Sequence, residues 1–158
     1  MARSHFIKPT APVEISIAVR LGPASSAYTD KEEGKIVKLA GESQYNLAVA
    51  GDEIEGIVTS VETAPQNLFS IAGVNVAFPQ ALVVFDGLQA TPGTGVVAIG
   101  DYVVAGSITA AGTALTSYPL VCKATAAGNT LNHKFRVVSL GTAGSGAVGK
   151  VGVIQRVA

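Results

Sequence analysis

Residues 45–58 decide the fold, and they read YNLAVAGDEIEGIV. Two mainly apolar runs, 45–49 and 54–58, lie on either side of Gly51 and Asp52. This pair is typical of a tight turn, because glycine tolerates a positive φ and aspartate hydrogen-bonds to nearby backbone. In the second run, apolar residues at 54 and 58 are interspersed with charges at 53 and 55. The stretch therefore predicts two short strands joined by a Gly-Asp turn.

Similar short runs, rich in β-branched residues and bounded by Gly, Pro, Asn or Asp, recur along the chain. They cover residues 34–39, 69–76, 81–85, 95–99, 102–108, 134–138 and 148–157. Only residues 79–84 and 109–114 suit one or two helical turns. A spacing of about ten residues between runs is typical of a β-sandwich or barrel. The expected fold class is all-β: a small β-sandwich or barrel of short strands with Gly/Pro-rich turns.

The first 29 residues differ in character from the rest. They hold Pro9, Pro12 and Pro23, and residues 13–19 between them alternate apolar with polar or small side chains. Proline cannot donate to a sheet ladder, so this pattern favours an edge strand within an extended arm. We therefore expect two parts, an extended N-terminal arm over 1–29 and a β-rich domain over 30–158.

Composition excludes several classes of protein. Eleven basic and eleven acidic residues cancel, and only 14% of the chain is charged, which argues against a polybasic nucleic-acid binder. No stretch approaches the roughly 18 apolar residues of a membrane span, and the start lacks a secretory signal. The expectation is a protein without nucleic-acid or membrane partners, made in the cytoplasm.

The distribution of charge is uneven. Residues 30–62 carry eight acids and three lysines, residues 63–122 carry only Asp86 and Asp101, and residues 123–158 carry five bases and no acid. The sparsely charged middle is either a surface that contacts protein or a solvated coat of Ser, Thr, Asn and Gln. The basic segment is expected to face the acidic one, in the same or a neighbouring subunit.

Catalytic, cofactor and metal signatures are weak. Residues 144–149 read GSGAVG and match the G-x-G-x-x-G spelling of a dinucleotide loop, but no helix and no downstream acid follow, so a glycine hairpin is expected. His5, His133 and Cys122 have no neighbouring ligands, and Asp52, Glu53 and Glu55 lack the spacing of a calcium loop. We expect no enzyme activity, no cofactor and no metal.

Two parts of the chain share a short sequence pattern, an internal echo. Residues 50–58, AGDEIEGIV, and 99–108, IGDYVVAGSI, share the order Gly-Asp, apolar, Gly, apolar. Duplication would produce this order, and so would independent use of a common turn, which is the favoured explanation.

Four segments together resemble bacteriophage capsid decoration proteins, also called cement or head-stabilising proteins. They are residues 34–39 (GKIVKL), 48–58 (AVAGDEIEGIV), 100–104 (GDYVV) and 135–138 (FRVV), the last followed by a Gly-rich turn and a terminal strand. The resemblance covers most of residues 30–157. It implies a small β-rich protein, often a homotrimer, that binds the outside of the expanded head where major capsid protein subunits meet and stabilises it against genome pressure.

The resemblance also implies where the coat is contacted. In such families an N-terminal arm commonly touches the coat, and residues 1–29 would fill that role. The expected capsid-interface residues are the apolar side chains of the arm, Phe6, Ile7, Val13, Ile15, Ile17 and Val19. The strand over 13–19 would add to a partner sheet by β-augmentation. A head fibre or receptor-binding β module of the virion is the alternative function, and an enzyme or ligand-binding barrel is the third.

Overall fold

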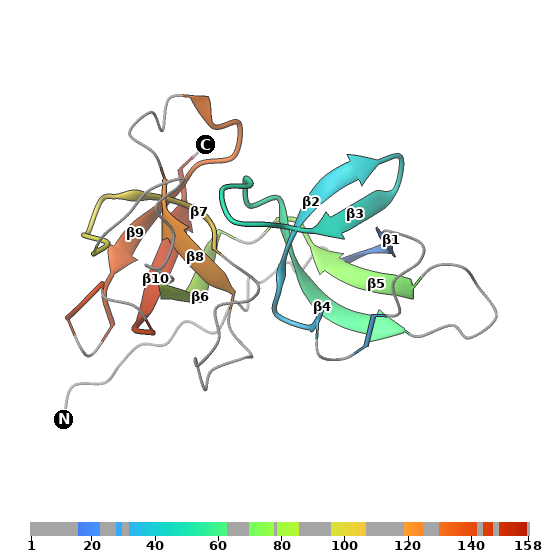
Figure 1. Cartoon of the computed structure of the whole chain (residues 1–158), viewed down its shortest axis with the longest axis horizontal. Coiled ribbons are helices and arrows are strands. Elements are labelled where there is room, and N and C mark those ends of the chain that lie inside the picture. The colour runs from blue at the N-terminus through green and yellow to red at the C-terminus, as the bar shows by residue number, and fades with distance from the viewer. Residues whose placement is uncertain are drawn as a thin grey trace.

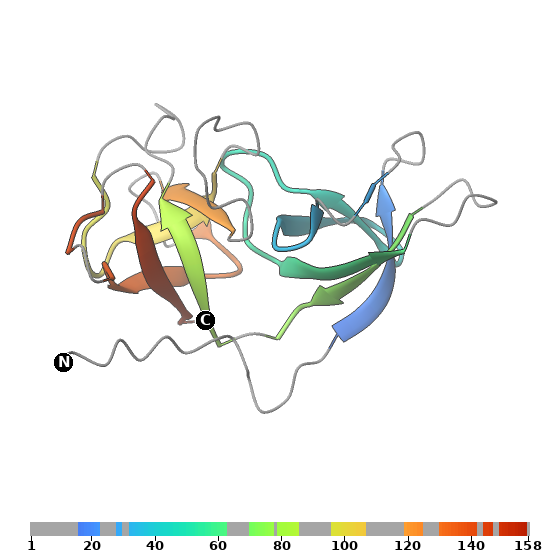
Figure 2. The ribbon, with the colours of Figure 1, turned by 90° about the horizontal axis from the view of Figure 1, so that it is seen from below.

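The chain folds into two separate β-barrels. The computed structural model describes residues 16–22, 28–29, 32–62, 70–77, 79–85, 96–106, 119–124, 130–141, 144–146 and 149–157. Ten strands within these ranges form two closed barrels of five strands, which lie side by side in Figure 1. They stay side by side in the perpendicular view of Figure 2. The predicted all-β fold class is confirmed.

Barrel 1 is built from the first half of the chain. Its strands are β1 Ser16–Gly22, β2 Ile36–Gly41, β3 Gln44–Leu47, β4 Gly56–Glu62 and β5 Ser70–Asn75. Around the barrel the order is β1-β3-β2-β4-β5, and β1 also pairs with β5 to close it. The β1–β3 pair is parallel and the other four are antiparallel.

Barrel 2 repeats this topology strand for strand. Its strands are β6 Gln80–Phe85, β7 Tyr102–Ala105, β8 Leu120–Lys123, β9 Phe135–Ser139 and β10 Val151–Arg156. Here β6 pairs with β8 in parallel and with β10 antiparallel, while β7 pairs with β8 and β9, and β9 with β10. Strands β6 to β10 therefore correspond one to one, in chain order, to β1 to β5.

The register is repeated wherever matching residues are paired in both barrels, although β2 has a further bulge between Leu39 and Gly41 without a counterpart on β7. Leu21 of β1 lies opposite Tyr45 of β3, and at the matching place Phe85 of β6 lies opposite Val121 of β8. Even the β-bulge recurs: one extra residue separates Val58 from Ser60 on β4, and one separates Val137 from Ser139 on β9. Bulges bend a strand at one defined point, so their coincidence shows that the two barrels share one backbone plan.

The matched interior positions carry matched side chains. Three of them hold valine in both barrels and are at most 4% exposed: Val19 and Val83, Val37 and Val103, Val58 and Val137. Burying a valine side chain contributes roughly 1.5–3 kcal/mol relative to leaving it exposed. At another matched pair of interior positions, a larger side chain on the first strand of the barrel is accompanied by a smaller residue on the last strand. In barrel 1 these positions hold Leu21 on β1 and Ala72 on β5. In barrel 2 they hold the larger Phe85 on β6 and Gly152 on β10, where an added Cβ would overlap the Phe85 ring.

Most strand predictions are confirmed, and three are corrected. The Gly-Asp turn joins β3 to β4 as expected, but residues 96–100 form a loop, in which buried Val97 packs into the core. Residues 79–84, considered for a helical turn, belong mainly to β6, and β8 was not foreseen. The alternative helical stretch, 109–114, lies outside the described residues.

The predicted arm is wrong over residues 16–22. These residues form β1, whose backbone pairs with β5 over residues 16–21 and with β3 over residues 20–22, and Val19 and Leu21 lie in the barrel 1 core. The prolines that suggested an arm lie outside the described residues. The boundary at residue 29 is also wrong, because β1 belongs to the same barrel as β2 to β5, and residues 30–158 span parts of two barrels.

Candidate functional site at the joint between the barrels

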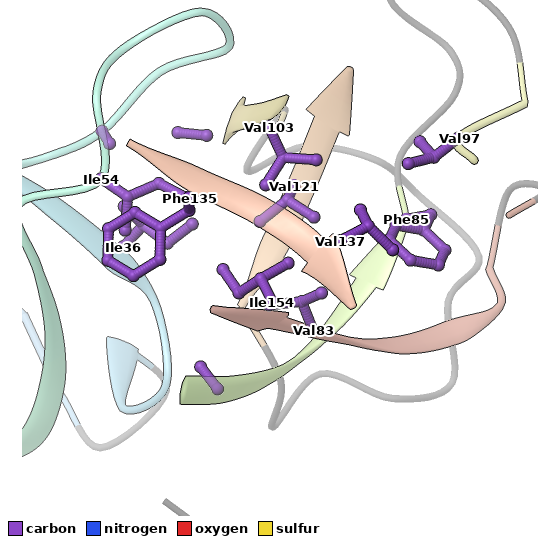
Figure 3. Close-up of a cluster of buried hydrophobic side chains, with 13 residues drawn as sticks. Ile36, Ile54, Val83, Phe85, Val97, Val103, Val121, Phe135, Val137 and Ile154 are labelled. Atoms are coloured by element: carbon purple, nitrogen blue, oxygen red, sulfur yellow. The ribbon is translucent and has the colours of Figure 1, made fainter. Parts of the chain in front are cut away.

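The two barrels meet at a joint with a shared apolar core. The buried cluster that fills barrel 2 includes Phe85, Val103, Val121, Phe135, Val137 and Ile154, and three residues of barrel 1, Ile36, Ala48 and Ile54, belong to it. Figure 3 shows Ile36 and Ile54 beside Phe135 at one end of this cluster and Val97 beside Phe85 at the other. Barrel 1 thus closes one end of barrel 2, and the two form one packed unit.

A backbone bridge reinforces the joint. The N–H of Gly51 donates to the carbonyl oxygen of Ala105, and the N–H of Ala105 donates to the carbonyl oxygen of Asp52, both with N···O distances of 2.9 Å. The Gly-Asp turn of barrel 1 therefore pairs with the end of β7 as a further strand would. Strand β9 pairs with Tyr102 and Val103 of β7 but not with Ala105. The turn therefore supplies the hydrogen-bond partners of the Ala105 backbone.

Glu53 clamps the loop before β9. Its Oε1 accepts the backbone N–H of Asn132 at 3.1 Å, and its Oε2 accepts the backbone N–H of His133 at 3.1 Å. Hydrogen bonds to a carboxylate are stronger than neutral ones, about 1.5–3 kcal/mol each before any loss to solvent exposure. This carboxylate brings the acidic segment of the sequence against the basic one, as the charge pattern predicted for the same or a neighbouring subunit.

Arg156 fixes the connection between the barrels. Its Nη1 donates to the carbonyl oxygen of Val76 at 3.4 Å, and its backbone N–H donates to the carbonyl oxygen of Pro79 at 2.9 Å. The Nη2 atom lies 3.0 Å from Nδ1 of His133, and because a guanidinium only donates, Nδ1 is the acceptor. The last strand of the chain is thereby tied to both ends of the linker and to the loop that Glu53 holds.

The echo found in the sequence is one turn used twice. Asp52 Oδ2 accepts the N–H of Val49 at 2.8 Å, and Asp101 Oδ2 accepts the N–H of Ala98 at 2.9 Å. Gly51 and Gly100 have φ values of 96° and 90°, which only glycine adopts without strain. The second turn bridges to Val137 as the first does to Ala105, through N···O distances of 2.8 and 2.9 Å.

Both turns are also held by a lysine. Lys38 Nζ lies 2.7 Å from Asp52 Oδ1, and Lys123 Nζ lies 2.8 Å from Asp101 Oδ2. Burial would raise the pKa of the Asp101 carboxyl, but the hydrogen bonds from Lys123 and Ala98 and the charge of Lys123 outweigh burial and lower that pKa. The two turns lie in connections that do not correspond between the barrels, β3–β4 in barrel 1 and β6–β7 in barrel 2. The shared turn sequence is therefore not a consequence of the repeated barrel.

The six expected capsid-interface residues are not brought together as a described surface. Phe6, Ile7, Val13 and Ile15 lie outside the described residues. Val19 is buried in the core of barrel 1, and Ile17 packs against the same core. The buried Val19 is not available to a partner while barrel 1 is folded, and its assignment to the interface is wrong. Ile17 is half-buried, so its place at the interface stays a prediction.

Sequence reasoning missed the residues that build the joint. It found no calcium-loop spacing at Glu53, placed Ile54 only in a predicted strand, and gave no individual role to Ala105 or Arg156. The repeated Gly-Asp pattern could have pointed to the joint. The residues two positions after each aspartate, Ile54 and Val103, are both buried in the shared core. Residues 34–39, 48–58, 100–104 and 135–138, which carry the resemblance to decoration proteins, all contribute to this joint.

Other chemistry was sought in the same part of the chain. Within the described ranges, no three His, Cys, Asp or Glu side chains gather closely enough to hold a metal ion. The described residues also contain no helix that is long and apolar enough to cross a membrane. Comparison of the chain with protein-family models, with curated proteins and with solved structures found no match.

Proposed function

We propose that the chain is a capsid decoration protein that binds the outer surface of an expanded bacteriophage head, at joints between major capsid protein subunits. One observation carries the proposal: the four segments that resemble decoration proteins converge on the joint between the barrels. There they supply Ile36, Ile54, Val103 and Phe135 to the shared core. The resembling residues are thus the ones that make two barrels into one body.

Such a joint suits a protein that bears load. A clamp across subunit boundaries must transmit force without hinging, and the joint combines an apolar core, a backbone bridge at Ala105 and the clamp of Glu53. Modest contacts with each coat subunit then add up over the shell, because symmetry repeats them many times.

The coat-binding arm is narrowed to the residues before β1. Ser16 is the first residue of the barrel and pairs with Asn75, the last residue of β5, next to the linker between the barrels. Residues 1–15, with Phe6, Ile7, Val13 and Ile15, are therefore joined to the molecule beside the joint. We propose that these four residues, rather than the buried Val19, contact the coat.

The copy number in purified virus particles tests the proposal. Quantitative mass spectrometry should find a ratio of this chain to major capsid protein of order one, or one in every few. A handful of copies per particle would instead identify a head fibre or receptor-binding module, and none would remove the chain from the virion. Heads assembled with a chain lacking residues 1–15 test the arm, since they should carry far less of it.

A further inference from the structure

One row of side chains on barrel 1 faces barrel 2. Along β2, Val37 belongs to the core of barrel 1, whereas its neighbour Ile36 belongs to the core shared with barrel 2. Along β4, Val58 lies in the barrel 1 core and Ile57 packs against the shared core. Successive side chains of a strand point to opposite faces, so Ile36 and Ile57, which lie opposite each other, form an outward row covered by barrel 2.

The repeat locates the same row on barrel 2. Ile36 lies opposite Ile57, and Ile57 opposite Asn75; at the matching places Tyr102 lies opposite Arg136, and Arg136 opposite Gln155. This second row is exposed: Tyr102 is 37% exposed and Arg136 is also exposed, whereas Ile36 is 4% exposed. Tyrosine and arginine are the residue types that most often dominate protein interfaces.

Charge indicates the partner. Barrel 1, residues 16–77, carries eight acids and four bases, and barrel 2, residues 79–157, carries two acids and five bases. The chain is therefore acidic in one barrel and basic in the other, and the intrachain joint already sets the acidic barrel against the basic one. A second copy of this chain offers the same acidic barrel to the exposed row.

The repeat also indicates where that second copy would be contacted. In the intrachain joint, β7 of barrel 2 receives barrel 1 at Ala105, and the matching residue on β2 of barrel 1 is Leu39. Leu39 is 54% exposed, and its N–H is capped by the acidic side chain of Glu55 at 2.7 Å. An apolar side chain beside a carboxylate complements a tyrosine beside an arginine.

We infer that the row Tyr102–Arg136–Gln155 of barrel 2 docks head to tail on the region of Leu39 and Glu55 in barrel 1 of a second copy. The contact is heterologous, meaning that each copy uses two different surfaces, so it builds a ring if its rotation closes and an open filament if it does not. This inference concerns the isolated chain and holds or fails independently of any role in a virion.

Two single variants and one control test the contact by light scattering and sedimentation of the full chain. Arg136→Glu and Leu39→Asp should each weaken self-association by about tenfold or more, since each removes one of the two surfaces. Lys150→Glu makes the same charge change in barrel 2 at the opposite end of β10, and should leave association unchanged. At concentrations where the parent chain is monomeric, thermal unfolding of all three should match the parent, because the altered side chains are exposed.

Mixing the two variants is the decisive experiment. Arg136→Glu keeps an intact Leu39 surface and Leu39→Asp keeps an intact Arg136 surface, so an equimolar mixture should form a one-to-one dimer and nothing larger. No association in the mixture, association that persists in Arg136→Glu alone, equal weakening by Lys150→Glu, or a parent chain that is monomeric at every concentration would each overturn the inference.

Discussion

Barrel 1 and barrel 2 share a strand order, a register and a bulge, yet they differ at one row of outward side chains. In barrel 1 this row is Ile36 and Ile57 and is covered; in barrel 2 it is Tyr102 and Arg136 and is exposed. The interiors, by contrast, keep valine at three matched positions. The comparison shows that the backbone plan and its interior are retained together, while the surface of each copy is adapted to what covers it.

The largest expected effect comes from placing a charge inside barrel 1. Val19→Asp should destabilise the protein by about 4 kcal/mol or more, because an aspartate would lie unpaired in an apolar core. Ala18→Asp, one position along β1 on the exposed side, should change stability by less than about 0.5 kcal/mol. Urea unfolding of both variants measures the difference.

This pair also separates a core strand from an arm. If residues 16–22 were an arm, Val19→Asp and Ala18→Asp would unfold at the same urea concentration, and both would leave the barrels intact. Val83→Asp, at the matched position of barrel 2, should behave like Val19→Asp, which extends the comparison to the second barrel.

A second, somewhat smaller effect is expected at the mouth of barrel 2. Phe135 is 2% exposed and lies where barrel 1 has Gly56. Phe135→Ala should cost about 3–5 kcal/mol, because it leaves a cavity against Ile36 and Ile54. Arg136→Ala, the next residue on β9, should cost less than about 0.5 kcal/mol in denaturant unfolding. A loss below about 1 kcal/mol for Phe135→Ala would show that the shared core is not closely packed.

Loosening the joint without altering either interior should have an intermediate effect. Glu53→Gln removes a charge from the hydrogen bonds to Asn132 and His133 and should cost about 1–2 kcal/mol. Hydrogen exchange at those two amides should quicken in the variant. Glu33→Gln, an exposed acid of the same barrel, provides the control and should alter neither stability nor exchange.

The smallest expected effect depends on pH. Because Lys123 and the N–H of Ala98 outweigh burial and lower the pKa of Asp101 below its ordinary value of 3.8, its ionised form stabilises the fold. That contribution is present above pH 3.8 and is lost as pH falls through the lower folded-state pKa. The pair is partly exposed, so Asp101→Asn should cost under about 1 kcal/mol at neutral pH.

Acid unfolding separates this contribution from general acid sensitivity. The stability of Asp101→Asn should approach that of the parent chain as the pH falls below 3.8. A constant difference between Asp101→Asn and the parent would contradict the role of the ionised carboxylate.

Local pattern was enough to predict most strands, but not the repeat. Alternation and Gly-Asp turns located β2 to β7, β9 and β10, but not β8. The repeat is hidden because the connections differ in length: two residues join β2 to β3, and fourteen join β7 to β8. The offset between matched residues therefore grows from 64 at Val19 and Val83 to 80 at Val74 and Ile154, and no fixed period relates the halves.

The joint could not be predicted for a different reason. Pro9, Pro12 and Pro23 suggested an arm, but pairing depends on partners far along the chain, and the residues of β1 pair with residues of β5 that are 49 to 59 positions away. Likewise Ile36 and Ile57 read as ordinary alternating strand residues. Only the placement of a second barrel against them distinguishes an outward row that is covered from one that is exposed.

The sequential order of the two barrels has a consequence for synthesis. Barrel 1 is contiguous over residues 16–75 and emerges from the ribosome before barrel 2, so it can close while β6 to β10 are still being made. During that interval Ile36 and Ile54 are exposed to solvent, because the barrel 2 residues that cover them are not yet available, and they form an apolar surface that favours aggregation or chaperone binding. Completion of barrel 2, in which Arg156 of β10 reaches back to the linker, ends this exposure.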